Sequence, residues 1–404
     1  MKLAKLPLAD IADINPLHER RLAPETEVSF LGMADVSGVG TTTSGETRPY
    51  REVRLGYTPF RSADLLLAKI TPCFQNGKIA QAEVTHEIGA GSTEFHVIRP
   101  RQNLVDARYL LRFLRQDWVR VEGELRMTGS GGQRRVPESY LRSLSVPVPP
   151  LAEQRHIATL LDQVDTLRAK RREAIALLDD LASSLFSDMF GDVIKRGGGV
   201  PLFSVADISS GITKGRKVPS GDLRTTPYLA VANVQDRALD LSTVKEIAAS
   251  VAEIERYKLL SEDLLLTEGG DPDKLGRGTL WRDELPVCIH QNHVFRVRVK
   301  TRAEVDPLYL NWVMSSSYGK GYFLRTAKQT TGIASINKTQ LGEFPLPVPP
   351  IARQKDFRSR IESVQESQQA HRTHLATLDE LFTSLQHRAF SGTLWEHDAT
   401  GEAA

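Results

Sequence analysis

The most constraining feature of this sequence is an internal repeat with an offset of about 200 residues. The string Val-Pro-Val-Pro-Pro at 146–150 recurs as Leu-Pro-Val-Pro-Pro at 346–350, and an Asp-Leu-Leu-Leu run occurs at 64–67 and again at 263–266. This period is far above the roughly 20 to 50 residues of solenoid repeats. The repeat therefore predicts one domain that is used twice and that accounts for nearly the whole chain of 404 residues.

A long helix is predicted after each proline-rich run. No Gly or Pro occurs from Leu151 to about Met189 or from Ile351 to about Phe390, and apolar residues recur there at spacings of three and four, as in a coiled-coil seam. Each helix of about 39 residues would extend for roughly 58 Å. The first helix is expected to end at the glycines that follow it, Gly191 and then 197–199, directly before the second globular part.

A single apolar stripe on so long a helix needs a partner, so we expect the two helices to pair as an antiparallel coiled coil about a pseudo-two-fold axis. The predicted interface consists of apolar residues from both helices: Ile157, Leu161, Val164, Ile175, Leu178, Leu185, Phe357, Ile361, Val364, Leu375, Leu378 and Leu385.

Near the middle of each helix the predicted seam becomes polar. Arg168 and Arg171 interrupt it in the first helix, and Gln368 and His371 interrupt it in the second. One interpretation is a solvated, locally loosened stretch, and the other is a polar layer that sets the register of the helices. The sequence alone leaves both open.

The remaining sequence mixes strand and helix patterns. Residues 95–98 and 294–298 alternate as strands do, whereas 107–121 and 307–317 have helical patterns. We therefore expect mixed α/β (α+β) globular domains. The predicted organisation is a domain at 1–147, a helical region at 148–196, a second domain at 197–347, a second helical region at 348–393 and a disordered tail at 394–404.

Composition excludes several classes of protein. No window approaches 18 to 20 apolar residues, and the first residues lack the apolar core of a secretory signal, so neither a membrane span nor a signal is predicted. Two cysteines cannot form a disulfide framework, which favours the cytoplasm. The net charge is only +2, and the positive excess lies in the globular parts, with +3 over 1–147 and +2 over 197–347.

No catalytic or metal-binding motif is convincing. The glycine-rich stretches at 129–132 and 276–278 match neither a Walker loop nor a dinucleotide fingerprint. Cys288, His290 and His293 could be imagined as metal ligands, but the first copy cannot reproduce the set, which favours structural roles. The residues alone therefore provide no convincing catalytic, metal or cofactor site, and a solitary methyltransferase or nuclease ranks below the other interpretations.

Two polar features point towards nucleic acid, and each has a plainer alternative. Arginines concentrate at 108–142, where they could contact phosphates or guanine, although an arginine-rich helix is more often a solvated face. The polar loops at 69–78 and 128–135 have counterparts in the second copy with different chemistry. Loops that recognise two different short DNA sequences would differ in their side chains in this way. Loops that diverged without a function after the duplication would differ in the same way.

Several strings in both copies resemble the specificity subunit of type I DNA restriction-modification systems. In the first copy they are Phe-Leu-Gly-Met-Ala-Asp-Val at 30–36, Lys-Ile-Thr-Pro-Cys-Phe at 69–74, Asn-Gly-Lys at 76–78 and Ser-Thr-Glu-Phe-His-Val at 92–97. In the second copy they lie at 228–235, 267–272 and 291–296. Both proline-rich runs, with Gln154 and Gln354 after them, complete the pattern. The tryptophan often found near the start of each family domain is absent.

This resemblance implies two target-recognition domains, at 1–147 and 197–347, that each read one half of a bipartite, asymmetric site in double-stranded DNA. The two helices would act as spacers that fix the gap between the halves. The resemblance also implies two modification subunits, which carry S-adenosylmethionine and methylate adenine, and two restriction subunits, which carry ATP and Mg²⁺. On this resemblance the chain itself is not an enzyme and has no metal or cofactor of its own. A scaffold for proteins without a DNA target is the alternative, and DNA-dependent modification by the complex distinguishes the two.

On this resemblance, polar side chains of the divergent loops are the candidate DNA contacts. In the first domain they are Lys69, Thr71, Gln75, Asn76, Lys78, Ser130, Gln133, Arg134 and Arg135. In the second domain they are Lys214, Arg216, Lys217, Lys274, Arg277, Gln291, Asn292, Lys328, Gln329, Ser335 and Lys338. Because the positive excess is small, we expect the isolated chain to bind DNA weakly and its partners to supply much of the phosphate neutralisation.

Overall fold

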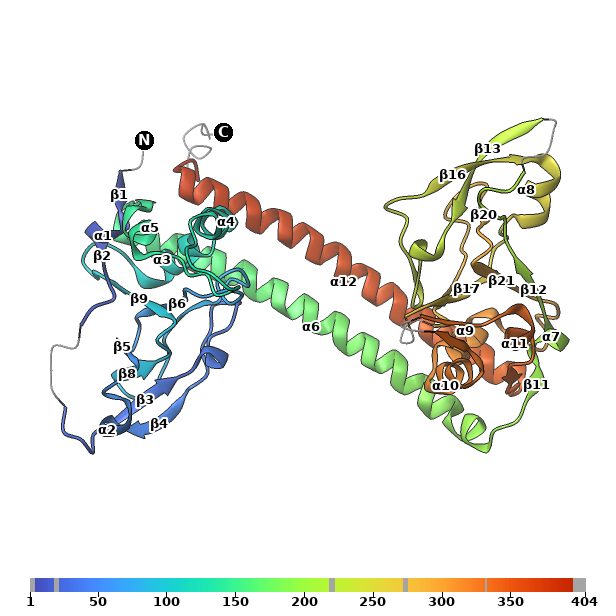
Figure 1. The fold of residues 1–404 in the computed structure, drawn as a ribbon, viewed down its shortest axis with the longest axis horizontal. Helices are drawn as coiled ribbons and strands as arrows, with labels where there is room; N and C mark the ends of the chain where they lie inside the picture. Colours follow the sequence, from blue (N-terminus) through green and yellow to red (C-terminus); the bar gives the residue numbers. More distant parts are fainter. Residues whose placement is uncertain (1–3, 18–21, 218–221, 272–274, 331–332, 395–404) are drawn as a thin grey trace, which may run out of the picture. The chain divides into compact units, whose positions relative to one another are not determined.

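The computed structural model describes residues 4–17, 22–217, 222–271, 275–330 and 333–394. The chain divides into two compact units, of which unit 1 contains residues 1–172 and 372–404 and unit 2 contains residues 173–371. Each unit therefore combines one globular part with part of each of two long helices, α6 (Leu151–Arg196) and α12 (Ile351–Ser391) (Figure 1).

Unit 1 has an α+β globular part. Its strands are β1 (Lys5–Pro7), β2 (Ala12–Ile14), β3 (Glu27–Leu31), β4 (Glu46–Pro49), β5 (Thr58–Arg61), β6 (Leu65–Ala68), β7 (Ile79–Gln81), β8 (Ile88–Gly91), β9 (Phe95–Pro100) and β10 (Ser145–Pro147). Its helices are α1 (Leu8–Ile11), α2 (Tyr50–Val53), α3 (Ala107–Leu114), α4 (Asp117–Leu125) and α5 (Glu138–Ser143), with a 3-10 turn at Met33–Asp35.

Unit 2 has the same kind of globular part. Its strands are β11 (Val200–Pro201), β12 (Ala206–Ser210), β13 (Leu223–Leu229), β14 (Val234–Gln235), β15 (Ala238–Leu239), β16 (Lys245–Ser250), β17 (Leu264–Thr267), β18 (Gly269–Gly270), β19 (Gly278–Leu280), β20 (Ile289–His290), β21 (Val294–Val299), β22 (Lys328–Thr330), β23 (Ile333–Ser335) and β24 (Pro345–Leu346). Its helices are α7 (Leu202–Val205), α8 (Val251–Tyr257), α9 (Pro307–Ser315), α10 (Ser317–Thr326) and α11 (Lys338–Gly342), with a 3-10 turn at Val231–Asn233.

The sheets of the two units have matching strand orders. In unit 1 one sheet has the order β2-β9-β6-β7 and the other has the order β4-β3-β8-β5, with β3 and β8 parallel. Unit 2 repeats the first as β12-β21-β17-β19 and the second as β16-β13-β20, again with a parallel pair, β13 and β20. The structure therefore confirms that one α+β domain is used twice.

The repeated Asp-Leu-Leu-Leu run forms an inner strand of one sheet in each unit. All four residues of β6 and of β17 are buried, because core side chains cover both faces of the strand. The buried aspartate before each strand accepts two hydrogen bonds from an arginine of the neighbouring strand: Asp64 from Arg99 at 2.7 and 2.9 Å, and Asp263 from Arg298 at 2.7 Å for both.

One predicted helix is divided in the structure. The helix expected at 107–121 forms α3 and α4, because Gln116 adopts an extended conformation and its Nε2 donates to Phe113 O at 3.1 Å, which caps the end of α3. The first long helix passes through Gly191 and ends at Arg196, directly before the later glycines that were also expected to end it. A single glycine costs a helix only about 1 kcal/mol, whereas Gly197 and the next two glycines all have positive φ and end it.

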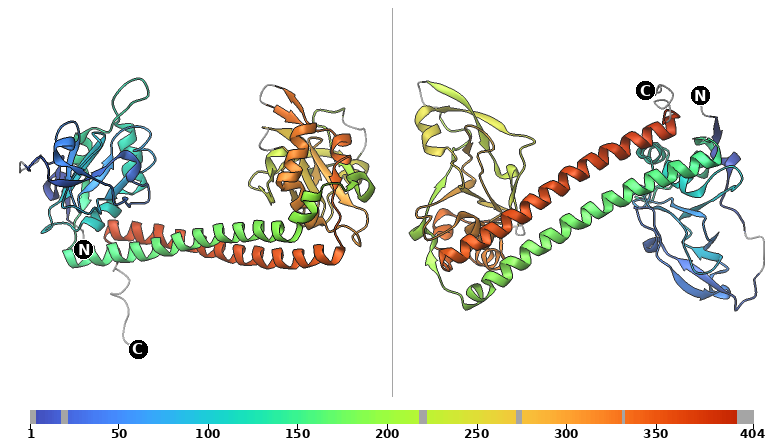
Figure 2. Two further views of the ribbon diagram at one scale, coloured as in Figure 1. Left: turned by 90° about the horizontal axis from the view of Figure 1, so that it is seen from below. Right: turned by 180° about the vertical axis from the view of Figure 1, so that it is seen from behind.

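Both long helices contribute to the core of each unit, where they lie next to one another (Figure 2). In unit 1, Ile157 and Leu161 of α6 and Phe390 of α12 belong to one buried cluster with residues of α3 and α5. In unit 2, the ring of Phe357 on α12 lies 5.7 Å from that of Phe186 and 5.2 Å from that of Phe190, both on α6. The long helices are thus part of the cores and not appendages.

A buried glutamine after each proline-rich run joins the long helix to its globular part. Gln154 is 0% exposed; its Oε1 accepts a hydrogen bond from Asp106 N at 2.8 Å, and its Nε2 donates to Leu104 O at 3.0 Å and Pro149 O at 2.7 Å. Gln354 makes the equivalent three bonds in unit 2. Each amide thus satisfies three backbone groups at the base of a long helix, which explains the glutamine in the repeated motif.

Within the described ranges, no helix combines the length and the apolar character that crossing a membrane requires.

We predict that Gln154→Leu destabilises unit 1 by about 3 kcal/mol, because it leaves a buried N–H and two buried carbonyls without their hydrogen bonds. Urea denaturation followed by fluorescence measures the loss. The matched control is Gln163→Leu, at an exposed position of the same helix, where we expect a change below about 0.5 kcal/mol. Equal losses in the two variants would contradict the assigned role of Gln154.

Candidate nucleic-acid interface

In unit 1, the two predicted DNA-contact loops lie side by side although they are far apart in the sequence. Val136 N donates to Lys69 O at 2.9 Å, and Thr71 N donates to Arg134 O at 3.0 Å. The hydroxyl of Thr71 donates to Gly132 O at 2.6 Å and accepts from Arg134 N at 3.1 Å. The structure therefore joins the loops at 69–78 and 128–135 into one surface.

Unit 2 repeats this backbone frame with other side chains. Ile336 N donates to Glu268 O at 2.9 Å, and Glu268 N donates to His293 O at 3.0 Å, just as Lys69 bonds to Val136 and Glu94 in unit 1. β18 also pairs with β23, which brings the stretch after Glu268 against Ser335. The same frame thus presents different chemical groups in the two units.

A further segment joins this surface in unit 2. Ile212 N donates to His290 O at 2.8 Å, and Asn292 N donates to Ile212 O at 3.0 Å. The side chain of His293 is hydrogen-bonded through Nδ1 to Glu268 at 2.7 Å. The predicted contacts at 214–217, 291–292 and 335 therefore come from three neighbouring segments.

Some predicted contacts of unit 1 are exposed, whereas others are engaged within the unit. Asn76, Ser130, Gln133 and Arg134 are exposed, and Lys69 and Thr71 are partly exposed. Gln75 donates to Glu124 at 2.7 Å, Lys78 donates to Met33 O at 2.9 Å, and Arg135 donates to both carboxylate oxygens of Glu94 at 2.8 and 2.9 Å. The hydrogen bond from Arg135 lowers the pKa of Glu94. The exposed residues are therefore the better placed to touch a ligand.

Unit 2 shows the same division. Lys214, Lys217, Lys328 and Lys338 are exposed, and Gln291, Asn292 and Ser335 are partly exposed. Arg216 donates to Glu253 at 2.6 and 2.8 Å and to Ala248 O at 3.0 Å, and Arg277 donates to Gln235 at 2.8 Å. Lys274 lies outside the described residues, as does the side chain of Gln329.

Arg108 is exposed, as a solvated face predicts, but Arg112 is only 11% exposed, and both arginines have partners on the long helix. Both pair with Asp162 on α6, and Arg112 also pairs with Asp165 at 2.7 Å. Burial disfavours the charge of Asp165, but the hydrogen bond from Arg112 and the nearby arginines outweigh it and lower its pKa. These arginines therefore join α3 to the long helix, a role that neither sequence interpretation included.

The polar layer between the long helices occurs at equivalent positions of the two copies. In unit 1, Arg168 Nε donates to Asp379 Oδ1 at 2.6 Å, and in unit 2 the buried Gln368 donates through Nε2 to Asp179 Oδ1 at 2.7 Å. Residue numbers 168 and 368, like 179 and 379, differ by one repeat. The structure thus favours the register-setting interpretation over a loosened, solvated stretch.

The predicted coiled-coil residues divide by burial. Those with at most 9% exposure are Ile157, Leu161, Val164, Phe357, Ile361 and Val364. Those that are partly buried are Ile175, Leu178, Leu185, Leu375, Leu378 and Leu385. Sequence reasoning missed Phe186, Phe190 and Phe390, which the three-and-four spacing of large apolar residues could have included.

The three imagined metal ligands of unit 2 have separate environments. Burial raises the pKa of Cys288 to about 12 and lowers that of His290 to about 4. His290 is hydrogen-bonded through Nδ1 to Val294 O at 2.7 Å, whereas His293 contacts Glu268. These contacts fit structural roles.

We predict that unit 2 loses stability in acid through Glu253. The hydrogen bond from Arg216 lowers the pKa of Glu253 from 4.5 to about 2, so the unfolded chain takes up this proton more readily than the folded one. The stabilisation is full above about pH 4.5 and is lost as the pH falls towards 2. The free energy of unfolding should therefore fall less between pH 6 and 3 in Glu253→Gln than in the unaltered chain. Glu255→Gln, on the same helix, should behave as the unaltered chain does, and a parallel pH profile for Glu253→Gln would contradict the prediction.

The chain is similar to proteins of known class. The family model for the type I restriction modification DNA specificity domain matches residues 6–177. The specificity subunit of the type I restriction enzyme EcoAI from Escherichia coli is 38% identical over 165 residues, which cover 40% of this chain and 27% of that protein. The EcoKI specificity subunit from Escherichia coli strain K12 is 23% identical over 339 residues, which cover 79% of this chain and 72% of that protein.

Solved structures extend the likeness to the fold of the whole chain. The S subunit of a type I restriction-modification system from M. genitalium aligns with a TM-score of 0.57 at 14% identity and covers 96% of both chains. The match to the EcoAI protein spans about a quarter of that relative's length. The matched family domain contains both loops of the unit 1 surface, and unit 2 repeats its fold. Residues 6–177 of the chain therefore match the type I restriction modification DNA specificity domain, and over a longer stretch the chain is similar to specificity subunits of type I restriction enzymes.

Proposed function

We propose that this chain reads DNA for a type I restriction-modification complex. Unit 1 reads one half of a bipartite, asymmetric site, and unit 2 reads the other half. The observation that carries this proposal is the pair of joined loops in each unit, which have the same backbone hydrogen bonds but different side chains. A shared frame with different polar groups suits the recognition of two different short sequences, because specificity comes from side chains at base edges.

The long helices are proposed to set the gap between the two half-sites. α6 contains 46 residues, which corresponds to roughly 69 Å at 1.5 Å per residue, more than the roughly 34 Å of one DNA turn. Helices that belong to the core of each unit suit a spacer, since a change in their length would be passed to the domains. The polar contacts of Arg168 and Gln368 support a defined register.

Catalysis is proposed to belong to partner subunits. Two modification subunits would bind S-adenosylmethionine and methylate adenine, and two restriction subunits would use ATP and Mg²⁺ to translocate and cleave DNA. The proposed role of this chain is to choose the sequence at which they act.

Mapping of methylated adenines by long-read sequencing tests the function directly. In a host that carries this chain and its modification subunit, we expect a bipartite motif that disappears when the chain is deleted. A chain that binds partner proteins while methylation is independent of it would instead support the protein scaffold.

We predict that seven residues inserted in both helices lengthen the gap by about three base pairs. The insertions belong between Arg168 and Asp179 in α6 and between Gln368 and Asp379 in α12, so that both polar contacts keep their partners. Seven residues add roughly 10.5 Å, and base pairs are spaced by about 3.4 Å. The methylation motif should keep both half-sites and change only its gap. The control has the insertion in α6 alone, which leaves the helices unequal and should reduce methylation. An unchanged gap in the double insertion would contradict the spacer role.

We predict that Arg134→Ala alters recognition of the first half-site only. Arg134 is exposed on the joined loops, and its guanidinium is 4.0 Å from Glu124, so little in unit 1 depends on it. Loss of a base contact should cost about 1 to 3 kcal/mol and relax one position of the motif. Arg126→Ala is the control, because Arg126 pairs with Glu122 on α4. Relaxation in both half-sites, or in neither, would show that Arg134 does not read a base.

A further inference from the structure

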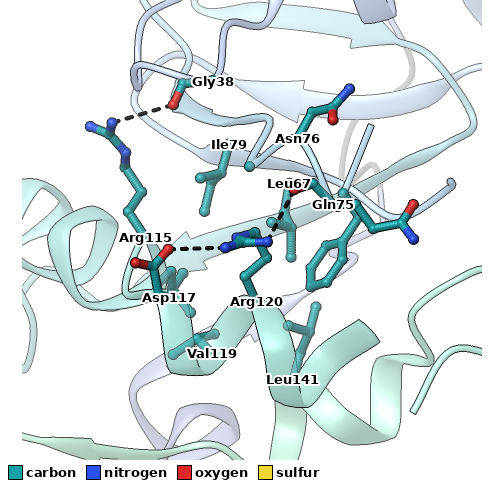
Figure 3. Close-up of a pocket in the computed structure, with 13 residues that line it drawn as sticks. Gly38, Leu67, Gln75, Asn76, Ile79, Arg115, Asp117, Val119, Arg120 and Leu141 are labelled. Atoms are coloured by element: carbon teal, nitrogen blue, oxygen red, sulfur yellow. Dashed lines mark hydrogen bonds and ion pairs between the residues drawn. The ribbon is translucent and has the colours of Figure 1, made fainter. Parts of the chain in front are cut away.

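A cavity of about 420 Å³ lies behind the loop at 69–78 of unit 1, between this loop and the corner where α3 meets α4 (Figure 3). Apolar side chains, among them Phe74 and Leu141, line part of it. Gln75 and Asn76 of the loop and two arginines, Arg115 and Arg120, supply its polar side. The cavity therefore adjoins the proposed DNA surface and is lined by two arginines.

Arg115 is a largely buried cation with few acceptors around it. Its side chain is 19% exposed and lies 3.8 Å from Asp165, and its Nη2 donates to Gly38 O at 3.3 Å. Burial, together with the neighbouring charge of Arg112, lowers its pKa. An anion in the cavity would relieve this cost, because a buried charge is stabilised by an opposite one.

The backbone opposite Arg115 leaves room for its guanidinium. A Cβ atom added to Gly40 would lie 2.7 Å from Nη1 of Arg115, and Gly40 has a φ of +97°. A larger residue at this position would displace the arginine. The absence of a side chain at Gly40 therefore allows the guanidinium of Arg115 to occupy its position beside the cavity.

Arg120 has its guanidinium between Asp117 and Gln75 (Figure 3). It donates through Nη2 to Asp117 Oδ1 at 3.1 Å and through Nη1 to Gln75 O at 3.3 Å. The carboxylate of Asp117 is 91% exposed, so water competes with this ion pair and weakens it. A guanidinium has five N–H donors, and these two bonds use only part of them.

We propose that this cavity binds one phosphate group of the duplex backbone, held by Arg115 and Arg120. The proposal rests on the proposed DNA-reading function and adds a contact that none of the loop residues predicted from sequence supplies. Two arginines that line one cavity suit a phosphate in charge, and each guanidinium keeps N–H donors that its printed bonds do not use. A phosphate here would anchor the strand beside the loop that carries Gln75 and Asn76, and so fix the register in which the bases are read.

The corresponding corner of unit 2 also carries an arginine, from the opposite wall. Position 315, one repeat after Arg115, is a serine, and Arg237, from the segment equivalent to Gly38–Gly40, lies over the ring of Trp312 at 4.2 Å. Arg237 and Ser315 both line a cavity at that corner, but its other wall is formed by residues of α6, among them Phe186 and Lys195, and none of the described residues of the equivalent loop lines it. This cavity is therefore not a counterpart of the one in unit 1, and the proposal concerns unit 1 alone.

The first test compares Arg120 of α4 with Arg126, the residue that follows this helix, through the salt dependence of DNA binding. The full chain is titrated with a fluorescent duplex from about 20 to 150 mM KCl, as the unaltered protein and as Arg120→Gln, Arg120→Lys and Arg126→Gln. Losing one phosphate contact should reduce the slope of log Kobs against log [KCl] by about 0.9. We expect this reduction, with about fivefold weaker binding at low salt, for Arg120→Gln. Arg126→Gln, whose partner is Glu122 outside the cavity, should resemble the unaltered chain.

Arg120→Lys separates a phosphate contact from a structural role. A lysine keeps the positive charge but cannot bridge Asp117 and the Gln75 carbonyl as the fork of an arginine does. If the charge contacts a phosphate, lysine should restore most of the slope. Failure of lysine to restore it would mean that Arg120 acts by holding the loop, and would overturn the proposal.

Asp117→Asn should change the affinity for duplex DNA in the opposite direction. Because Asp117 is exposed, the substitution should not impair folding. Removing this carboxylate frees Arg120 and should tighten duplex binding about two- to threefold, whereas Glu122→Gln should leave it nearly unchanged. Weaker or equal binding by Asp117→Asn would count against the proposal.

The same two arginines could instead bind a free phosphate compound. Titrations of the chain with inorganic phosphate and with ATP distinguish such a ligand from the phosphate of a DNA backbone. Submillimolar binding of either to the unaltered chain but not to Arg120→Gln, with an unchanged salt slope for DNA, would assign the cavity to a free ligand and overturn the backbone contact. Equal slopes without such binding would overturn the inference and leave DNA reading intact. If the unaltered chain binds no DNA duplex, either alone or with its modification subunit, both the proposed function and the inference about the cavity fail.

Discussion

The rest of the structure depends on the burial of both long helices in each core. In unit 1, Leu161 and Phe390 pack into the cluster that also holds α3, and in unit 2, Phe190 and Phe357 do so with α9. Truncation of such a buried aromatic residue typically costs about 3 to 5 kcal/mol, so neither globular part can turn freely on its helix segments. The buried amides of Gln154 and Gln354 add directional bonds where each helix begins. The direction of each helix is therefore fixed within the unit that contains it.

Much of this architecture could be predicted from local patterns. The proline-rich runs and the Asp-Leu-Leu-Leu runs revealed the duplication because each has one compact structural cause, a helix base in the first case and an inner strand in the second. The three-and-four spacing of apolar residues located both long helices, because this periodicity directly reflects one buried face. The proline-rich runs also carried the resemblance to the specificity subunits, together with the strings at 30–36, 69–78 and 92–97 and their counterparts in the second copy.

Other features depended on contacts that sequence spacing does not encode. Arg108 and Arg112 could not be assigned because their partners, Asp162 and Asp165, lie some 50 residues further along, on another helix. The joined loops were seen as separate candidates, since backbone bonds such as that between Lys69 and Val136 arise only from the folded chain. Gly191 was considered as a possible helix end. In the structure, the packing of its neighbour Phe190 outweighs the destabilising effect of a single glycine on the helix.

The ion pairs between α3 and α6 have a consequence for building chimeric subunits. A junction placed in the proline-rich run before α6 looks natural, because it coincides with the visible domain boundary. Such a junction would combine Arg112, which is only 11% exposed, with a helix from another parent that lacks matching acids at 162 and 165. An unpaired buried charge costs several kcal/mol. A junction inside α6 after residue 172 would instead transfer the arginines and their aspartates together, so the exchangeable module of this chain extends well into its helix.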